Sequence, residues 1–188
     1  MDEIAMARHG ESEASASGLV GGDTPLTQGG RDEACALGQR LRPLAIDVCV
    51  TSTARRARET AAVALAGRDI AMTVDADLGE IQFGSFEGRP LAEYRAWIGT
   101  HRPDEAPPNG ESRVATLRRF ARAFRRLIER RERFVLVVAH GLTVRSLLDP
   151  KPMPVVAGTA YGSCVVFAAR EFERAVGRLE RWCESPRW

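Results

Sequence analysis

Short apolar runs alternate with amphipathic stretches along most of the chain. Nearly all-apolar runs occupy residues 4–7, 46–50, 70–74, 134–139 and 163–169. Runs of this length and composition predict strands that are buried on both faces of a sheet. A last edge strand is predicted at residues 176–182, where apolar side chains recur near the end of the chain.

The segments between these strands carry apolar residues at spacings of three and four, which predicts helices. Thr27 is the expected N-cap of the first of them, and Pro90 the expected first residue of another. The predicted helices follow Thr27, follow residues 51–53, and cover 90–98, 112–131 and 143–148. Loops are predicted at 14–23, 75–89 and 99–110, and around the prolines at 150–154. Alternating strands and helices indicate an α/β protein with a mainly parallel sheet.

Composition narrows the function classes. The chain has 188 residues, 44% of them hydrophobic, and a net charge of +2. A nearly neutral chain has no bulk field that would draw it to nucleic acid or to a membrane surface. No apolar run approaches the roughly 20 residues of a membrane span. The first strand begins so close to Met1 that we expect no signal peptide and a cytoplasmic location.

The four cysteines show no paired spacing of the kind that binds metal. Cys49 and Cys164 lie in apolar runs. We therefore expect buried free thiols, as is usual in a reducing compartment.

Chemically active residues gather where predicted strands end. The first strand runs into Arg8-His9-Gly10, and the strand at 134–139 runs into His140-Gly141. If these two strands are parallel neighbours, both imidazoles emerge at the same sheet edge, where ligands of α/β proteins bind.

Two further groups are expected at that edge. Ser52, Arg55 and Arg56 lie in another strand-to-helix turn, and Glu80 lies in a loop that could reach over the site. Arginine forks bind phosphoryl oxygens, a neutral histidine attacks phosphorus, and a carboxylic acid protonates the leaving oxygen. The set therefore predicts phosphoryl transfer without a metal.

Five motifs in order then resemble the histidine phosphatase superfamily, in its phosphoglycerate mutase-like phosphatase branch. They cover residues 3 to about 170. The matching segments are 8–12 (Arg-His-Gly-Glu-Ser) with 23–30, 52–61 (Ser-x-x-x-Arg-Ala-x-x-Thr-Ala), 78–88 around Glu80, 108–112 (Pro-Asn-Gly-Glu-Ser), and 139–145 around His140. The register of the second motif makes Arg56, rather than Arg55, the phosphate-binding arginine.

The resemblance implies roles for individual residues. His9 would be the nucleophile that becomes phosphohistidine, and Glu80 the proton donor. Arg8, Arg56 and His140 would bind the phosphoryl group. Phosphate or substrate contacts are also expected from a second set: Ser15, Gly21, Ser52, Gly141 and Leu142. Ser15 stands where the family often has asparagine, and Ser17 and Gly18 are alternatives to Ser15 and Gly21 as phosphate contacts in the 15–23 loop.

The expected architecture is a three-layer sandwich with helices on both faces of the sheet and a small helical cap. We expect one domain over residues 1–188, with residues 85–115 as the cap over the active site. By resemblance, the aromatic stripe at Tyr94 and Trp97 lies in the segment that covers the site. Arg145 is expected to brace the His140 loop or to pair with a carboxylate.

The predicted function is hydrolysis of a small phosphorylated metabolite, with no cofactor, metal, nucleic acid or membrane partner. A phosphoglycerate mutase would use the same residues, but mutases of this type resemble longer chains. A non-catalytic phospho-ligand binder would have no use for His9 and Glu80. Nucleic-acid binding through the arginines of the 112–131 helix is the remaining alternative, against a solvated amphipathic face. Monomer and homodimer both stay open.

Overall fold

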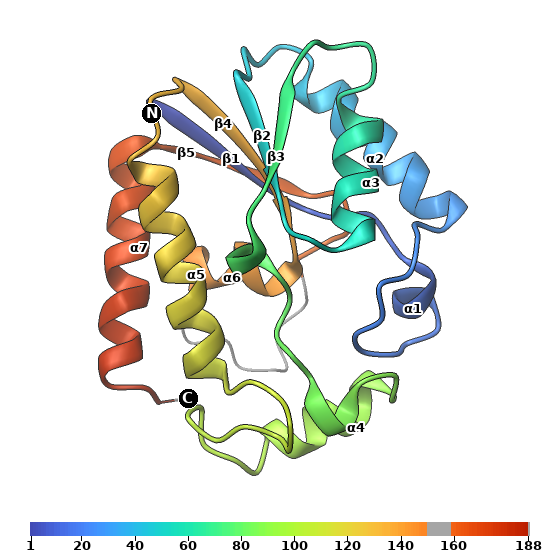
Figure 1. Cartoon of the computed structure of the whole chain (residues 1–188), viewed down its shortest axis with the longest axis vertical. Helices are drawn as coiled ribbons and strands as arrows, with labels where there is room; N and C mark the ends of the chain where they lie inside the picture. Colours follow the sequence, from blue (N-terminus) through green and yellow to red (C-terminus); the bar gives the residue numbers. More distant parts are fainter. Residues whose placement is uncertain (150–158, 188) are drawn as a thin grey trace.

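The computed structural model describes residues 1–149 and 159–187, and in them a five-stranded sheet has the order β3-β2-β4-β1-β5 (Figure 1). Four strands are parallel, and β5 runs antiparallel to β1. The strands are β1 (Glu3–Arg8), β2 (Val48–Thr51), β3 (Ala71–Val74), β4 (Phe134–Ala139) and β5 (Cys164–Ala168). The predicted α/β sheet is confirmed. The proline loop predicted at 150–154 lies outside the described residues.

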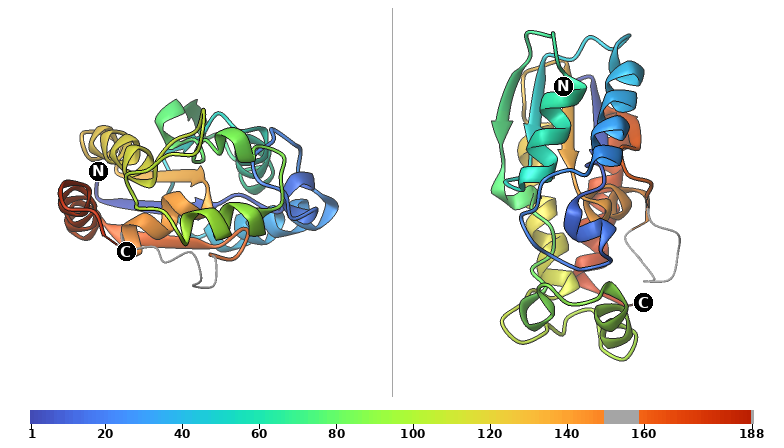
Figure 2. Two further views of the ribbon diagram at one scale, coloured as in Figure 1. Left: turned by 90° about the horizontal axis from the view of Figure 1, so that it is seen from below. Right: turned by 90° about the vertical axis from the view of Figure 1, so that its right-hand side faces the viewer.

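Helices cover both faces of the sheet, as expected. On one face, α2 (Gln28–Leu41) and α3 (Arg55–Ala64) pack on the side chains of Ala5, Ala7 and Leu136. On the other face lie α5 (Arg113–Ile128), α6 (Gly141–Leu148) and α7 (Ala169–Glu184). Figure 2 shows the sheet between these two layers. Because each central strand is covered twice, it needs apolar residues at every position.

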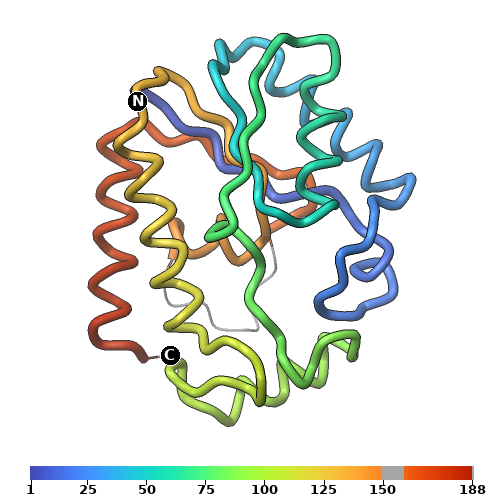
Figure 3. Tube along the Cα trace, in the orientation of Figure 1, coloured from blue at the N-terminus to red at the C-terminus, as the bar shows by residue number. Residues whose placement is uncertain are grey.

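Strand register fixes which residues meet at the carboxyl edge of the sheet. Strands β1 and β4 pair in parallel with Arg8 opposite Ala139. His9 and His140 therefore leave the sheet side by side, although 131 positions separate them in the sequence. The trace in Figure 3 shows these two distant segments running next to each other.

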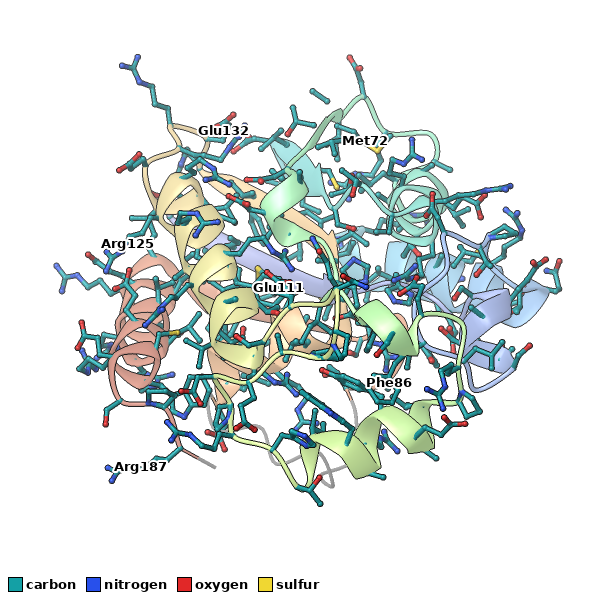
Figure 4. The ribbon with its side chains drawn as sticks, turned by 60° about the horizontal axis from the view of Figure 1, so that its bottom comes forward. Met72, Phe86, Glu111, Arg125, Glu132 and Arg187 are labelled. Atoms are coloured by element: carbon teal, nitrogen blue, oxygen red, sulfur yellow. The ribbon has the colours of Figure 1, made fainter. Side chains whose placement is uncertain are left out.

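A third apolar cluster lies beyond that edge and is separate from the two sheet cores. It packs α4 (Leu91–Ile98) against the short 3-10 helix η2 (Gly84–Phe86) and Val20. Phe86 packs edge-on against Tyr94, at 5.7 Å between ring centroids, and Figure 4 shows Phe86 on the side of its segment toward α4. This cluster holds the 84–98 segment opposite the carboxyl ends of the strands.

Several element predictions need correction. Residues 176–182 belong to helix α7 and form no strand, since Phe172, Val176 and Leu179 line one buried helical face. Pro90 is the N-cap of α4, and the helix begins at Leu91. The loop predicted at 14–23 contains the one-turn helix α1 (Glu13–Ala16). A further 3-10 helix, η1 (Ala76–Leu78), interrupts the loop predicted at 75–89.

Other local predictions are confirmed. Thr27 caps α2 by accepting a hydrogen bond from the Gly30 amide. The four cysteines are free thiols, as expected, but only Cys49 and Cys183 are buried. Cys164 is partly buried and Cys35 is exposed, so the expected burial is wrong for Cys35. None of the helices in the described part of the chain has the length and apolar character needed to cross a bilayer.

Candidate active site

His9 lies just beyond β1, and its two ring nitrogens have different partners. Nδ1 is 2.7 Å from the Gly10 carbonyl oxygen, which can only accept a hydrogen bond. Nε2 is 3.2 Å from Arg56 Nε, which can only donate. The proton is therefore on Nδ1, and Nε2 keeps the lone pair that a nucleophile needs.

Close backbone packing explains the glycine after His9. A Cβ on Gly10 would lie 2.3 Å from the Gly30 carbonyl oxygen, so no larger residue fits without movement. The Gly10 amide donates to Thr60 Oγ1 at 3.0 Å, and Thr60 in turn donates to the Arg56 carbonyl. The first and second motifs of the sequence are thus joined directly by hydrogen bonds.

Arg56 lies at the centre of the site. Its Nη2 is 3.3 Å from His140 Nδ1, and its Nη1 donates to the Gly22 carbonyl at 2.8 Å. Arg56 thereby contacts both histidines and the 15–23 loop. Arg55 points away, remains exposed, and pairs with Glu59 at 2.7 Å.

His140 is completely buried at the N-terminus of α6. Ser52 Oγ lies 2.9 Å from its Nε2. Since the Arg56 guanidinium faces Nδ1 as a donor, Nε2 carries the proton and donates it to Ser52. Ser52 is itself fully buried, so it orients His140 from behind.

Both histidines are held neutral. Burial lowers the pKa of His9 to about 3, with a further contribution from Arg56. Burial also lowers the pKa of His140 well below its usual value, and the neighbouring His9 and Arg56 add to the effect. A neutral His9 is ready to attack, and two neutral rings only 5.2 Å apart avoid mutual repulsion.

Arg8 lies on the other side of His9. Its guanidinium stacks 3.7 Å above the ring of Tyr161 and donates to the Thr159 carbonyl. A Cβ on Gly141 would lie 3.2 Å from Arg8 Nε, so glycine at 141 leaves room for the arginine. Tyr161 is a site residue that sequence reasoning missed, because nothing in its local sequence marks it.

Glu80 reaches the site from the loop after η1. Its Oε2 is 3.7 Å from His140 Nδ1, and its Oε1 accepts from the Ile81 amide at 3.1 Å. The side chain is 24% exposed, which leaves it open to both substrate and water.

Arg119 of α5 fastens the loop that carries Glu80. It donates to the carbonyls of Asp77 and Gly79, both at 2.8 Å, and to that of Glu80 at 3.1 Å. Its remaining donors bind Glu111 at 3.0 and 2.7 Å. The sequence showed Arg119 only as one of the arginines of the 112–131 helix, with no sign that it supports the site.

The other arginines of α5 are mostly engaged within the molecule. Arg126 pairs with Asp75 and Asp77, each at 2.8 Å, and Arg125 pairs with Glu180. Arg118, Arg122, Arg125 and Arg126 are nonetheless exposed, so the solvated amphipathic face expected from the sequence is confirmed. The ion pairs reduce the free cationic surface that a nucleic acid would need.

These groups enclose a small cavity of about 120 Å³. Arg8, His9, Arg56 and Glu80 line it, together with Ser15, Gly21 and Tyr161. Two guanidinium groups, one neutral imidazole and one carboxylate around so small a space suit a single phosphoryl group.

The 15–23 loop forms one wall of this cavity. Gly21 and Gly22 both have positive φ, and the Gly22 amide donates to Glu87 Oε1 at 2.7 Å. Glu87 therefore shapes the loop. The Ser15 hydroxyl is 2.9 Å from that of Ser12, at the back of the cavity.

Two larger cavities adjoin the small one, and Glu80 lines all three. One of about 780 Å³ opens on the side of Gly21, Thr53 and Gln82. The other, of about 310 Å³, opens on the side of Arg8 and contains Gly141 and Leu142. The structure thus brings most of the predicted site residues together: His9, Arg8, Arg56, His140, Glu80, Ser15 and Gly21. Ser52 lies behind His140. Gly141 and Leu142 line the adjoining cavity of about 310 Å³.

Comparisons with known proteins found a matching family and similar sequences. A family model described as the histidine phosphatase superfamily (branch 1) matches residues 4–150. An adenosylcobalamin/alpha-ribazole phosphatase of Salmonella typhimurium (strain LT2) is 35% identical over 150 residues, covering 72% of each chain. A 2,3-bisphosphoglycerate-dependent phosphoglycerate mutase of Methylobacterium sp. (strain 4-46) is also 35% identical, over 162 residues, covering 77% of this chain and 78% of the mutase.

The fold has close counterparts among solved structures. A putative alpha-ribazole-5'-P phosphatase from Escherichia coli superposes with a TM-score of 0.77 and 26% identity. The match covers 89% of this chain and 90% of the other.

Proposed function

Because the chain belongs to the histidine phosphatase superfamily and is a phosphoric monoester hydrolase, we propose that it hydrolyses a small phosphorylated metabolite through a phosphohistidine on His9, without a metal. The observation that carries the proposal is the pair of contacts at His9. They leave Nε2 unprotonated and facing the cavity that Arg8 and Arg56 line.

In the first step, His9 Nε2 attacks phosphorus and forms an N–P bond while the bond to the leaving oxygen breaks. Protonated Glu80 gives its proton to that oxygen, so the alcohol part of the substrate leaves as a neutral alcohol. Arg8 and Arg56 bind the non-bridging oxygens, on which negative charge is spread in the transition state.

In the second step, Glu80 is a carboxylate and takes a proton from water as the water attacks phosphorus. The N–P bond breaks, its electrons return to His9 Nε2, and inorganic phosphate leaves. Glu80 is again protonated, so the cycle is closed. His140 contributes a further donor once the arriving dianion raises the pKa of its ring, since a nearby negative charge favours the charged imidazolium.

Transfer of the phosphoryl group to a second alcohol is the alternative. The mutase relative is as similar to this chain as the phosphatase relative is, at 35% identity each. Both reactions proceed through the same phosphohistidine, and they differ only in whether water or an alcohol accepts the group.

The first experiment is hydrolysis of p-nitrophenyl phosphate by the wild type, by His9→Ala and by His101→Ala. We expect wild-type activity that is unchanged by EDTA, lost in His9→Ala and retained in His101→Ala, whose ring stacks on Trp97 outside the site. Trapping of an acid-labile phosphoenzyme that maps to His9 completes the test. Activity retained in His9→Ala contradicts the mechanism.

Phosphatase and mutase are separated by the fate of the phosphoryl group. With phosphoglycerate as substrate, a phosphatase releases inorganic phosphate in step with substrate loss. A mutase instead interconverts the phosphoglycerate isomers with little release. We expect stoichiometric release.

A further inference from the structure

The cavity of about 310 Å³ beside the phosphoryl site has features that the reaction chemistry alone does not require. It is continuous in its lining with the small cavity, because Arg8, Glu80, Phe83 and Tyr161 border both. A group bound there would be attached to the phosphoryl oxygen that Glu80 protonates. This cavity is therefore positioned for the alcohol part of a substrate.

The lining of this cavity is strongly cationic. Arg8, Arg95, Arg113 and Arg145 contribute to it, and Glu80 is its one carboxylate among the described residues. Burial lowers the pKa of Arg113; Tyr94 and Glu80 oppose that shift, and the neighbouring Arg145 adds to it. Arg113 and Arg145 border the same cavity.

The larger cavity lacks this excess of positive charge. Its lining includes Arg56 and Arg119, but also Asp23, Glu80 and Glu87. The charges there are nearly balanced. An anionic alcohol would therefore favour the smaller cavity on the Arg8 side.

Apolar side chains complete the smaller cavity. Tyr94 and Ile98 come from α4, and Leu142 from the first turn of α6. Burial raises the pKa of Tyr94 to about 12, so its phenol stays neutral and keeps its proton. The lining suits a compact organic body that carries a charged group at its far end.

We propose that Arg113 and Arg145 bind a second anionic group, a carboxylate or a phosphate, on the alcohol part of the substrate. The proposal rests on the proposed function and narrows it to phosphomonoesters that carry another negative charge. Guanidinium forks match both anions in geometry, and the two arginines border the same cavity. A neutral alcohol would offer them no charge-assisted hydrogen bond.

The test uses two phosphate esters of the same shape. In 4-carboxyphenyl phosphate the leaving group carries a carboxylate, and in 4-carbamoylphenyl phosphate a neutral amide replaces it. We expect the wild type to favour the carboxylate ester by about tenfold or more in kcat/KM, since a hydrogen bond to a charged group is worth about 1.5–3 kcal/mol. Equal rates for the two esters overturn the proposal.

Variants then locate the effect. Arg113→Gln and Arg145→Gln should each remove most of the preference, chiefly by raising KM for the carboxylate ester, while hydrolysis of the amide ester continues. Arg122→Gln is the matched control, because Arg122 lies on the same helix and is 61% exposed beside Asp77. Loss of activity toward both esters in equal proportion in both variants contradicts the assignment.

The nature of the anion is resolved with three aliphatic esters: the phosphate esters of propan-1-ol and 3-hydroxypropanoate, and propane-1,3-diol bisphosphate. The proposal predicts that one or both of the charged esters exceed the propyl ester, and which one does identifies the anion. Failure of the proposed function has a different signature. No ester, charged or neutral, would then be hydrolysed or would label His9.

Discussion

At the scale of single residues, the site depends on one arginine that holds two histidines in defined protonation states. Arg56 donates toward Nε2 of His9 and Nδ1 of His140, so it fixes the tautomer of both rings at once. A guanidinium group has several donors in one rigid plane, whereas an ammonium group is a compact charge that cannot direct donors to two separate rings in this way. Arginine is therefore required at this position for its shape as well as its charge.

Arg56→Lys should lower kcat/KM by about 100-fold, because at least one charge-assisted contact is lost and each is worth about 1.5–3 kcal/mol. Steady-state hydrolysis measures this effect. Arg55→Lys is the control on the adjacent position, where the side chain is exposed and pairs only with Glu59 in a surface contact. Equal losses in the two variants would contradict the assignment, because a general change at the start of α3, and not the contacts of Arg56 with the histidines, would then explain the loss.

A second prediction at the level of single residues concerns Ser52. Ser52→Ala leaves the proton on His140 Nε2 without its acceptor, which costs about 1–3 kcal/mol for a buried donor. We expect kcat to fall by about tenfold or more on that basis. The ¹⁵N shifts of the His140 ring should show a changed tautomer. Thr53→Ala removes an exposed hydroxyl next to it and should change neither quantity.

At the scale of elements, helix α5 supports the catalytic loop. Arg119 binds the carbonyls of Asp77, Gly79 and Glu80 as well as the Glu111 carboxylate, and its side chain is only 13% exposed. These contacts determine where Glu80 stands relative to His140. Arg119 is a positioning residue, since it acts through Glu80.

Arg119→Lys should lower kcat by about tenfold to 100-fold while changing KM much less, because misplacement of a proton donor affects the transition state most. Substrates with good leaving groups, such as p-nitrophenyl phosphate, need little protonation and should lose less than alkyl phosphates. A uniform loss for both substrate types would indicate a general folding defect. Arg122→Lys, on the exposed side of the same helix, serves as the control.

Sequence patterns predicted most elements and one of their errors is instructive. The apolar runs marked the central strands because strands covered on both faces need apolar residues throughout. The same reasoning failed at residues 176–182, where the apolar positions of α7 recur at helical spacing within a segment rich in charge. The apolar run at 70–74 also marked the edge strand β3, but all four of its positions are exposed, so the burial expected on both faces was wrong there.

The candidate site was predictable where a residue ends a strand or matches a motif. Tyr161 and Arg119 could not be predicted as site residues, because their contacts depend on tertiary structure. Tyr161 lies shortly before the antiparallel strand β5, and its ring stacks on Arg8. The same holds for Arg113 of α5, which lines the cavity of about 310 Å³ together with residues of α4.

At the scale of the whole molecule, the sheet assembles the site from three strands. His9 follows β1, His140 follows β4, and Ser52 follows β2, and these strands are neighbours in the order β2-β4-β1. Neither histidine environment exists until all three strands pair. The protonation of the two rings is therefore coupled to global folding.

This coupling predicts how stability depends on pH. In the unfolded chain, histidines titrate near pH 6.5, whereas in the folded protein the pKa of His9 is about 3 and that of His140 is well below 6.5. Between these values the unfolded state binds more protons, so the free energy of unfolding falls as the pH is lowered from 6.5 toward 3. The stabilisation is fully present above pH 6.5. Each histidine should contribute a slope of up to about 1.4 kcal/mol per pH unit.

Urea unfolding at pH 5.0, 5.5, 6.0 and 7.0 measures this slope above the range in which most carboxylates titrate. His9→Asn should reduce the slope between pH 5 and 6 by about half, because one of two coupled rings no longer takes up a proton on unfolding. His101→Asn is the matched substitution at a partly buried position outside the sheet edge. A wild-type free energy of unfolding that stays constant across this range would show that the two buried rings are already charged in the folded protein. His9 would then lack the free lone pair on which the mechanism depends.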